Sequence, residues 1–224
     1  MAKPLQDIIS DLRQEETRWD AILELKLLTN DSYVEPLINL LNDDNWVIRW
    51  CVAEKLGEMG DVRAIEPLIE LLKDPDFHVK KNAAKSLERF GQKSVPALAS
   101  LLDNLENEIR KQARDILLAQ GKKSLKQMEI EMYRHDWVAG NQLLYCIWKI
   151  GQIDAEEILI HALKSPDLRR NSIVFLGLMR SKKALPKIIK LYQYSKLKRD
   201  VLNMLSRYSK DEVFPLVKIG RAHV

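Results

Sequence analysis

The chain has 224 residues, 46% of them hydrophobic, and its formal net charge at pH 7 is +4. The cysteines, Cys51 and Cys146, have no Cys-x-x-Cys or paired histidine spacing near them, so neither a disulfide nor a metal site is expected. No apolar run approaches the ~20 residues needed to cross a bilayer, and the first residues lack the apolar core of a signal peptide. The composition argues against a membrane protein and predicts a cytoplasmic, helix-rich protein with no cofactor.

The charge is unevenly distributed along the chain. Residues 1 to 50 contain 5 Lys and Arg against 10 Asp and Glu, a net charge of −5. Residues 151 to 224 contain 15 against 7, a net charge of +8. Such asymmetry can steer a partner or favour head-to-tail self-association.

Residues 4 to 30 predict a pair of helices that caps the N-terminal end of the fold. Pro4 opens the first helix, where its missing N–H costs nothing, and apolar residues recur at helical spacing in both. Polar residues on the outer side of the first helix keep that side charged, as a terminal repeat requires.

Residues 36 to 60 and 67 to 91 contain the most regular pairs of helices. In the second pair, a short apolar helix opens at Pro67 and ends at the Asp-Pro-Asp sequence of residues 74 to 76. A second helix, apolar at every fourth position, then runs to Gly91, which suits a left-handed C-terminal cap. Each segment therefore predicts a helical hairpin.

The same hairpin recurs at residues 96 to 121, 126 to 151, 158 to 180 and 186 to 210. The opening prolines are Pro4, Pro36, Pro67, Pro96, Pro186 and Pro215, with Lys126 and Ile158 at the two places without one. The closing glycines are Gly60, Gly91, Gly121 and Gly151. The first core residues of the second helices are Ile48, Val79, Ile109, Val138, Leu168 and Leu197. This repetition predicts an all-α fold, an α-solenoid with a right-handed superhelix of about seven two-helix repeats of ~30 residues.

Two features interrupt the regularity. Residues 126 to 151 diverge most, because Lys126 replaces the proline and Gly140 stands near the start of the second helix, which is compatible with a bend, an inserted contact or sequence drift. Aromatic residues precede the second helices at Trp46, Phe77 and Trp137. We interpret these aromatics as hydrophobic staples, or as plugs between hairpins, rather than as ligand-stacking groups.

An eighth hairpin begins near Pro215 and stops at residues 219 to 224, Ile-Gly-Arg-Ala-His-Val. The nucleotides ATC GGA AGA GCA CAC GTC encode this hexapeptide, and they belong to a widely used sequencing-library adapter. We therefore predict that residues 1 to 218 form a single repeat domain whose natural chain is longer, and that residues 219 to 224 are an assembly artefact.

The first helix Pro-Leu-Ile-x-Leu-Leu-x-Asp, the second helix Val/Ile-Arg/Lys-x-x-Ala-Ala-x-x-Leu, and the closing glycine resemble the short HEAT-like repeats named after phycobilisome lyases. The resemblance covers nearly the whole chain, and such repeats occur in bilin lyases and in many interaction scaffolds. It also implies that an Asp in the turn pairs with the basic residue six positions later. Here Asp43 with Arg49 and Asp74 with Lys80 fit that pattern, whereas Asn104 before Arg110 lacks the charge.

The sequence predicts no catalytic residue. It contains no glycine-rich phosphate loop, no Gly-x-Ser-x-Gly and no His-Glu-x-x-His. His78, His135 and His161 fall in different repeats, where solvated or capping histidines are expected.

Basic and aromatic residues form two columns when the second helices are set in register. The first column contains Arg18, Arg49, Lys80, Arg110, Arg169 and Lys198 and is broken only at Ala139. The second contains Trp19, Trp50, Lys81, Lys111, Gly140, Arg170 and Arg199, about 200° from the core positions at 100° per residue. The second column should line the inner, concave surface, while the first can also form a structural ladder with the turn carboxylates.

We therefore predict a non-catalytic scaffold whose concave, basic, Trp-containing face binds a protein or peptide with acidic residues. The candidate binding residues are Trp19, Trp50, Arg49, Lys80, Lys81, Arg110, Lys111, Arg169, Arg170 and Arg199. Nucleic-acid binding through the basic, tyrosine-containing C-terminal third is one alternative. A bilin-lyase-like protein acting on a phycobiliprotein is another, implied by the resemblance alone.

Overall fold

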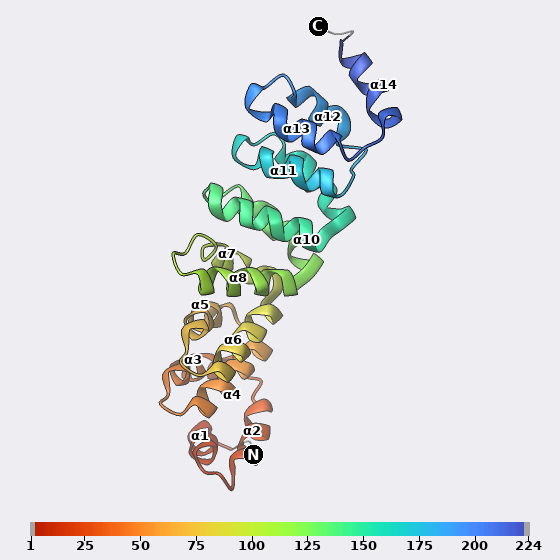
Figure 1. Ribbon diagram of the computed structural model, residues 1–224. Helices are drawn as coiled ribbons and strands as arrows, with labels where there is room; N and C mark the ends of the chain where they lie inside the picture. The colour runs from red at the N-terminus through yellow and green to blue at the C-terminus, as the bar shows by residue number, and fades with distance from the viewer. Residues whose placement is uncertain (1–2, 222–224) are drawn as a thin grey trace. The chain divides into compact units, whose positions relative to one another are not determined.

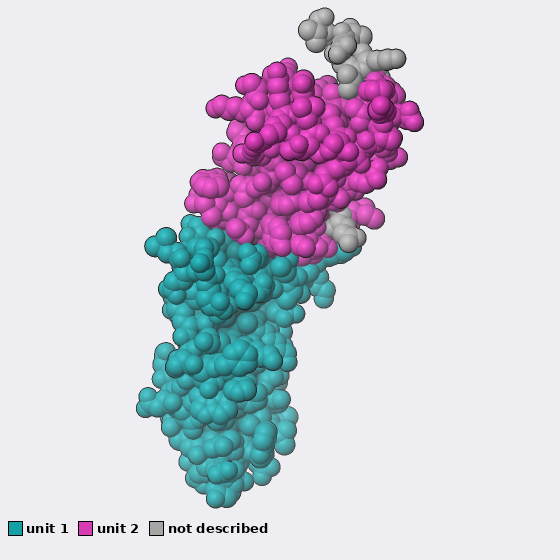
Figure 2. All heavy atoms as spheres, in the orientation of Figure 1, with its two compact units in different colours: residues 1–124 teal, residues 125–224 magenta. Residues whose placement is uncertain are grey.

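The computed structural model describes residues 3–221, except for the side chains of residues 152 and 217–221. Within that part of the chain, all regular structure is helical. The chain forms two compact units, residues 1–124 and residues 125–224 (Figure 2). Of the segment 219–224 that we assigned to an adapter, residues 222–224 and the side chains of the other three lie outside the described part.

The first unit consists of four helical pairs, which match the first four predicted repeats (Figure 1). The pairs are α1 (Leu5–Arg13) with α2 (Arg18–Lys26), α3 (Val34–Asn39) with α4 (Trp46–Met59), α5 (Ile65–Glu70) with α6 (Phe77–Phe90), and α7 (Val95–Ala99) with α8 (Asn107–Gln120). Short 3₁₀ turns extend or connect these helices at Asp31–Tyr33, Leu40–Asn42, Val62–Ala64, Leu71–Lys73, Gly91–Lys93 and Gly121–Ser124. The second helices α4, α6 and α8 pack side by side in succession.

The second helices begin and end where the local chemistry requires. The Asn45 side chain accepts a hydrogen bond from the Val47 amide at 2.9 Å, and Asp76 accepts from the His78 and Val79 amides at 2.8 and 3.1 Å. At the other end, α4 stops at Gly60, whose φ of 65° is left-handed. Gly91 and Gly121 also end their helices with positive φ, at 54° and 66°, so three of the four predicted glycine stops are confirmed. The left-handed cap expected at Gly91 is wrong, because its ψ is −133°.

The core lies between first and second helices of successive repeats. Ile48, Val79 and Ile109, the predicted first core positions of α4, α6 and α8, are no more than 4% exposed. Leu37 and Leu68 of the first helices are fully buried opposite them. Because each hairpin is covered on one side by the next, the stack supplies the burial that one hairpin lacks.

The second unit contains α9 (Leu125–Met132), α10 (Trp137–Ala162), α11 (Pro166–Leu178), α12 (Leu185–Leu191), α13 (Lys198–Leu205) and α14 (Lys210–Arg221), with a 3₁₀ turn at Ser195–Leu197. Helix α10 packs against α9 and α11, and α11 packs against α13. The unit continues the hairpin pattern, although its first repeat departs from the prediction in two ways.

The predicted helix stop at Gly151 is wrong. Helix α10 runs through this glycine as one continuous helix of 26 residues, so the predicted first helix at residue 158 is its C-terminal part. A single helical glycine costs about 1 kcal/mol, and Ala155, Glu156 and Glu157 are good helix formers. The position of the expected proline holds Ile158, so nothing at the following helix start compels a break.

The predicted register of α10 is wrong by one residue. Ala139 is fully buried, whereas Val138 is only half-buried. The cap explains the shift, since Asp136 accepts from the Ala139 amide at 2.9 Å and places Ala139 three residues after the cap, as Ile48 follows Asn45. Ala139 is therefore a core residue and not a gap in the first basic column. With this register, Gly140 occupies the first-column position of the repeat.

The interpretation of the aromatic residues as staples or plugs is also wrong. Trp46, Phe77 and Trp137 are 44%, 65% and 66% exposed. Each lies two residues before a core position, hence about 160° from it around the helix. The Trp46 ring lies 5.9 Å from the His78 ring of the next repeat, at the surface.

The second helix of the sixth repeat ends in a residue with strained backbone. Arg180 has φ 54° and lies twelve residues after Leu168, as Gly60 follows Ile48. The Ser181 amide donates to the Leu176 carbonyl at 3.0 Å, which closes the left-handed cap. An arginine thus occupies the conformation that glycine adopts without strain.

We expect Arg180→Gly to raise the free energy of unfolding by about 1 kcal/mol, because it removes the left-handed strain of an L-residue. Urea denaturation measures this change. The matched control is Arg180→Ala, which loses the same guanidinium contacts with Glu212 and Tyr208 but keeps the strain. Equal stabilities of the two variants would show that the backbone conformation carries no strain.

Candidate functional site

The arginines of the first basic column close the turns inside their own hairpins. Arg18 Nε donates to the Leu12 carbonyl at 3.2 Å, and Arg169 Nε donates to the Leu163 carbonyl at 2.7 Å. Arg110 donates in the same way to the Asn104 carbonyl. In each pair the arginine follows the carbonyl by six residues, so the arginines of this column share the role of turn closure.

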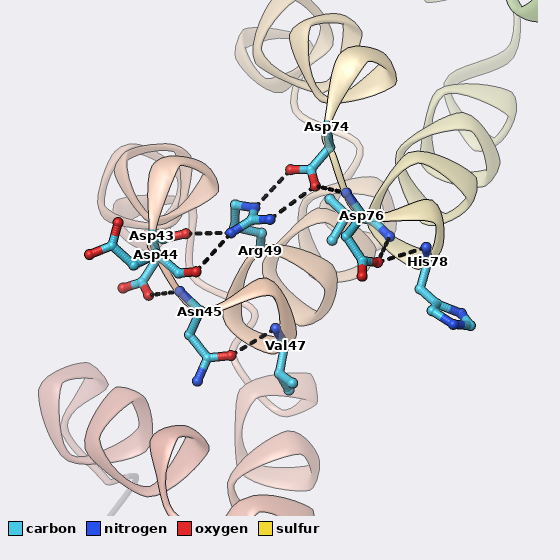
Figure 3. Close-up of polar contacts among 9 residues, drawn as sticks. Asp43, Asp44, Asn45, Val47, Arg49, Asp74, Asp76 and His78 are labelled. Carbon is cyan, nitrogen blue, oxygen red and sulfur yellow. Dashed lines mark hydrogen bonds and ion pairs between the residues drawn. The ribbon is translucent and has the colours of Figure 1, made fainter.

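Arg49 closes its turn and also joins two repeats (Figure 3). Its Nη1 donates to the Asp43 and Asp44 carbonyls at 2.8 and 3.1 Å. Its Nε and Nη2 donate to the two carboxylate oxygens of Asp74 at 2.7 and 2.9 Å, a bidentate pair between α4 and the turn before α6. The Arg49 and Asp74 side chains are only 12% and 6% exposed.

The expected pairing within each repeat is therefore wrong. Asp74 binds Arg49 of the preceding repeat, and among the described residues Lys80 forms no ion pair with it. Asp43 instead pairs with Arg13. The Arg49 Nη1 bonds to the turn of its own repeat. Its Nε and Nη2 therefore face Asp74 in the turn of the next repeat.

Burial raises the pKa of Asp74, but the hydrogen bonds from Arg49 and from the Asp76 amide outweigh it, so the pKa lies below its ordinary value. The same hydrogen bond raises the pKa of Arg49. Arg49 is thus committed to the protein's own structure.

We expect Asp74→Asn to lower the free energy of unfolding by about 3 kcal/mol at pH 7, because it leaves Arg49 buried without its counter-charge. The pKa of Asp74 is lowered on folding, so its contribution is present above the unfolded pKa of about 3.9 and is lost as the pH falls below it. Urea denaturation from pH 7 to pH 3 should show the gap between the two proteins closing.

Asp61→Asn is the matched control for this experiment. The Asp61–Arg63 pair has the same charges, but its side chains are 21% and 45% exposed. We expect little loss of stability there, since solvent screens such pairs. Equal losses for the two variants would contradict a special role for the inter-repeat pair.

The second column differs from the first in that its cations are exposed. Lys81 and Lys111 on α6 and α8 lie on the surface with no ion pair among the residues that the structure describes. Trp50 is only half-buried, and its carbonyl accepts a hydrogen bond from Asn82 at 2.8 Å. These residues face away from the core, as the spacing predicted.

Trp19 belongs to an exposed apolar stripe that sequence reasoning missed. Trp19 and Leu23 on α2, and Leu27 at its C-cap, are 73%, 62% and 78% exposed. They are four residues apart, so they lie on one face of the helix. The four-residue spacing of Trp19, Leu23 and Leu27 indicates this stripe in the sequence. The prediction instead relied on Leu25 and Leu28, which lie on the opposite, buried face.

The second unit carries a surface of different charge, which we call the basic apolar surface. Its apolar members are Val174 and Leu178 on α11 and Leu202 on α13, which are 41%, 42% and 52% exposed. Its cations are Arg170 on α11 and Arg199 on α13. Sequence reasoning identified the arginines but not the aliphatic residues beside them.

Aromatic rings support the basic apolar surface from α10. Trp148 stacks on Phe175 with ring centroids 4.8 Å apart and planes 9° apart, and Tyr145 lies 6.3 Å from Phe175. The Lys149 ammonium lies 5.1 Å from the Trp148 ring centroid. Arg170 pairs with Asp200 at 2.9 Å yet remains 59% exposed, so the surface keeps a positive character.

The other candidate chemical groups are dispersed. Cys51 and Cys146 are buried and not joined, and burial raises the pKa of the Cys51 thiol to about 12. His161 Nδ1 lies 3.3 Å from the Tyr133 hydroxyl, and His135 lies 3.5 Å from Glu131. Within residues 3–221, no group of three or more His, Cys, Asp or Glu side chains could hold a metal ion. No described helix is both long and apolar enough to span a bilayer.

A family model for HEAT repeats matches residues 2–76 and 34–118, which together cover more than half of the chain. The chain belongs to the HEAT-repeat family. The family and the stacked hairpins confirm the predicted all-α solenoid for this HEAT-repeat protein. Its sequence matches none of the curated proteins.

Solved structures similar to this HEAT-repeat protein include the CpcE and CpcF complex of phycocyanin lyase from Nostoc sp. PCC7120. The identity is 20%, the match covers 100% of this chain and 97% of that one, and the TM-score is 0.41. Human deoxyhypusine hydroxylase matches at 16% identity over 91% and 96% of the two chains, with a TM-score of 0.40. A designed armadillo repeat protein matches at 18% identity over 79% and 100%, with a TM-score of 0.33. These similarities carry no information on activity.

Proposed function

We propose that this HEAT-repeat protein is a non-catalytic scaffold that binds a protein or peptide segment carrying both acidic and apolar residues. The observation that carries the proposal is the basic apolar surface, where Val174, Leu178 and Leu202 are 41–52% exposed beside Arg170 and Arg199. Helices α11 and α13 pack against each other, and large apolar side chains exposed on both favour an interaction site over simple solvation.

The charges around this surface favour an acidic partner. Arg199 and Lys149 are exposed and form no ion pair among the residues described, and Arg170 remains largely exposed in its pair with Asp200. Arginine is enriched among the residues that dominate binding energy at interfaces. Acidic groups on the partner would neutralise these cations while its apolar side chains cover Val174 and Leu178.

In the first unit, we assign the binding role to the second column rather than to the first. Lys81 and Lys111 are exposed, with half-buried Trp50 on the preceding second helix. Arg49 and Arg110, like Arg169 in the second unit, donate hydrogen bonds to turn carbonyls of the protein itself. Lys80 is half-buried. Trp19 lies close in sequence to the acidic residues Glu16 and Asp20, so an acidic partner would avoid it.

Nucleic-acid binding through the C-terminal third is the second candidate, because residues 151 to 224 carry 15 Lys and Arg against 7 Asp and Glu. Tyr192 and Tyr194 are 43% and 50% exposed, but Lys198 and Arg169 lie 5.5 and 5.9 Å from their rings, where a base would have to stack. A bilin-lyase-like activity rests on the resemblance alone and predicts a coloured product on co-expression with a phycobiliprotein.

A pull-down from source-organism lysate tests the scaffold. The wild type should retain proteins at high salt and after nuclease treatment. A Leu178→Glu, Arg199→Glu double variant should retain at least about tenfold less protein, as expected when residues that dominate binding are changed. Circular dichroism should show unchanged helicity, since both side chains are exposed.

Lys187→Glu on α12 is the matched control, an exposed charge reversal on a first helix. It should leave capture unchanged. Capture by the double variant equal to that of the wild type would remove the proposal. Nuclease-sensitive nucleic acid that is released by salt would favour the second candidate.

A further inference from the structure

Helix α2 presents an apolar stripe away from its own core. Trp19, Leu23 and Leu27 are each more than 60% exposed, although Ala21, Ile22 and Leu25 of the same helix are buried. The helix is therefore apolar on two faces, and only one of them packs within the first unit. Three large exposed apolar side chains on a nine-residue helix and its C-cap point to a contact with another surface.

Acidic residues accompany this stripe. Glu15, Glu16 and Asp20 are exposed, and none of them forms an ion pair with a residue that the structure describes. The first 50 residues carry a net charge of −5. The α2 stripe thus combines apolar area with negative charge, which is the chemistry proposed above for the partner of the basic apolar surface.

The two surfaces also match in spacing. Leu23 and Leu27 are four residues apart on α2, and Val174 and Leu178 are four residues apart on α11, so both pairs are about 6 Å apart along their helices. Two such stripes can interdigitate at the usual interhelical distance of about 8–10 Å. Asp20 and Glu16 then face a surface that contains Arg170, Arg199 and Lys149.

We propose that the basic apolar surface binds helix α2 of a second copy of this chain. The proposal rests on the proposed function, since it names the partner of the same surface. The contact is heterologous, because it joins two different patches, so each dimer keeps one free α2 stripe and one free basic apolar surface. Assembly grows with protein concentration unless a ring closes.

Two variants separate the two sides of this contact. Leu23→Lys disables the α2 stripe and leaves the basic apolar surface intact, whereas Leu178→Glu does the reverse. Sedimentation velocity at low salt should show the mass of the wild type rising with concentration, and each variant alone remaining monomeric. An equimolar mixture of the variants should form a dimer that grows no further, since only one productive contact is left.

The control and the milder variants exclude a folding defect. Lys187→Glu on α12 should associate like the wild type, and all variants should share its circular dichroism and melting temperature. Asp20→Arg and Arg199→Glu should each weaken association about tenfold or more, since like charges then face each other. Mixing these two should restore growth with concentration, because both contacts between unlike copies are then of opposite charge. Both residues are exposed, so neither substitution disturbs the core.

A wild type that stays monomeric at every concentration would overturn the proposal, as would single variants that associate like the wild type or a mixture that stays monomeric. The proposed function fails separately. If Leu178→Glu loses captured proteins while the wild type is monomeric, the scaffold stands and its partner is another protein. If Leu178→Glu affects neither capture nor association, both proposals fall.

Discussion

No single hairpin of this protein can bury the apolar residues that it carries, and this constraint determines the rest of the structure. Ile48, Val79 and Ile109 are buried where hairpins stack, since α4, α6 and α8 pack against one another in succession. The polar groups of the turns must then be satisfied where successive hairpins meet. Arg49 meets this need, since it closes its own turn and holds Asp74 of the next one. Hydrophobic stacking supplies the driving force, and the buried ion pair selects how adjacent turns align.

The same constraint separates residues that hold the fold from residues that can act on a partner. Arginines of the first column point along the stack into turns, so their charge is consumed within the protein. Lys81, Lys111, Arg170 and Arg199 lie one position later in their helices and are exposed. The chemistry of that outer face changes along the chain, from apolar and acidic on α2 to apolar and basic on α11 and α13. A repeat fold permits this change, because outer residues vary without cost to the core.

The sequence allowed the fold to be predicted because proline, glycine and the core positions repeat independently. The prediction was wrong where it relied on a single residue, such as a glycine or an apolar position, without the residues around it. Gly151 resembles a helix stop, but the good helix formers after it outweigh the cost of one glycine. Val138 fits the numerical spacing of the core, but the cap at Asp136 sets the register and places Ala139 inside. The exposed aliphatic residues Leu23, Leu178 and Leu202 were missed because apolar residues at helical spacing are typical of a core. The sequence alone does not show which of two apolar helix faces is buried.

Helix α10 has a further consequence for how the chain can vary. It serves as the second helix of one repeat and the first helix of the next, with no loop between them. Insertion or deletion of one residue in a loop is absorbed by local rearrangement. The same change within α10 would rotate everything after it by about 100° relative to everything before it. Length variation among natural relatives should therefore accumulate in the turns of the other repeats and be absent from the middle of α10. The length of this helix fixes the distance and rotation between the two repeats that share it.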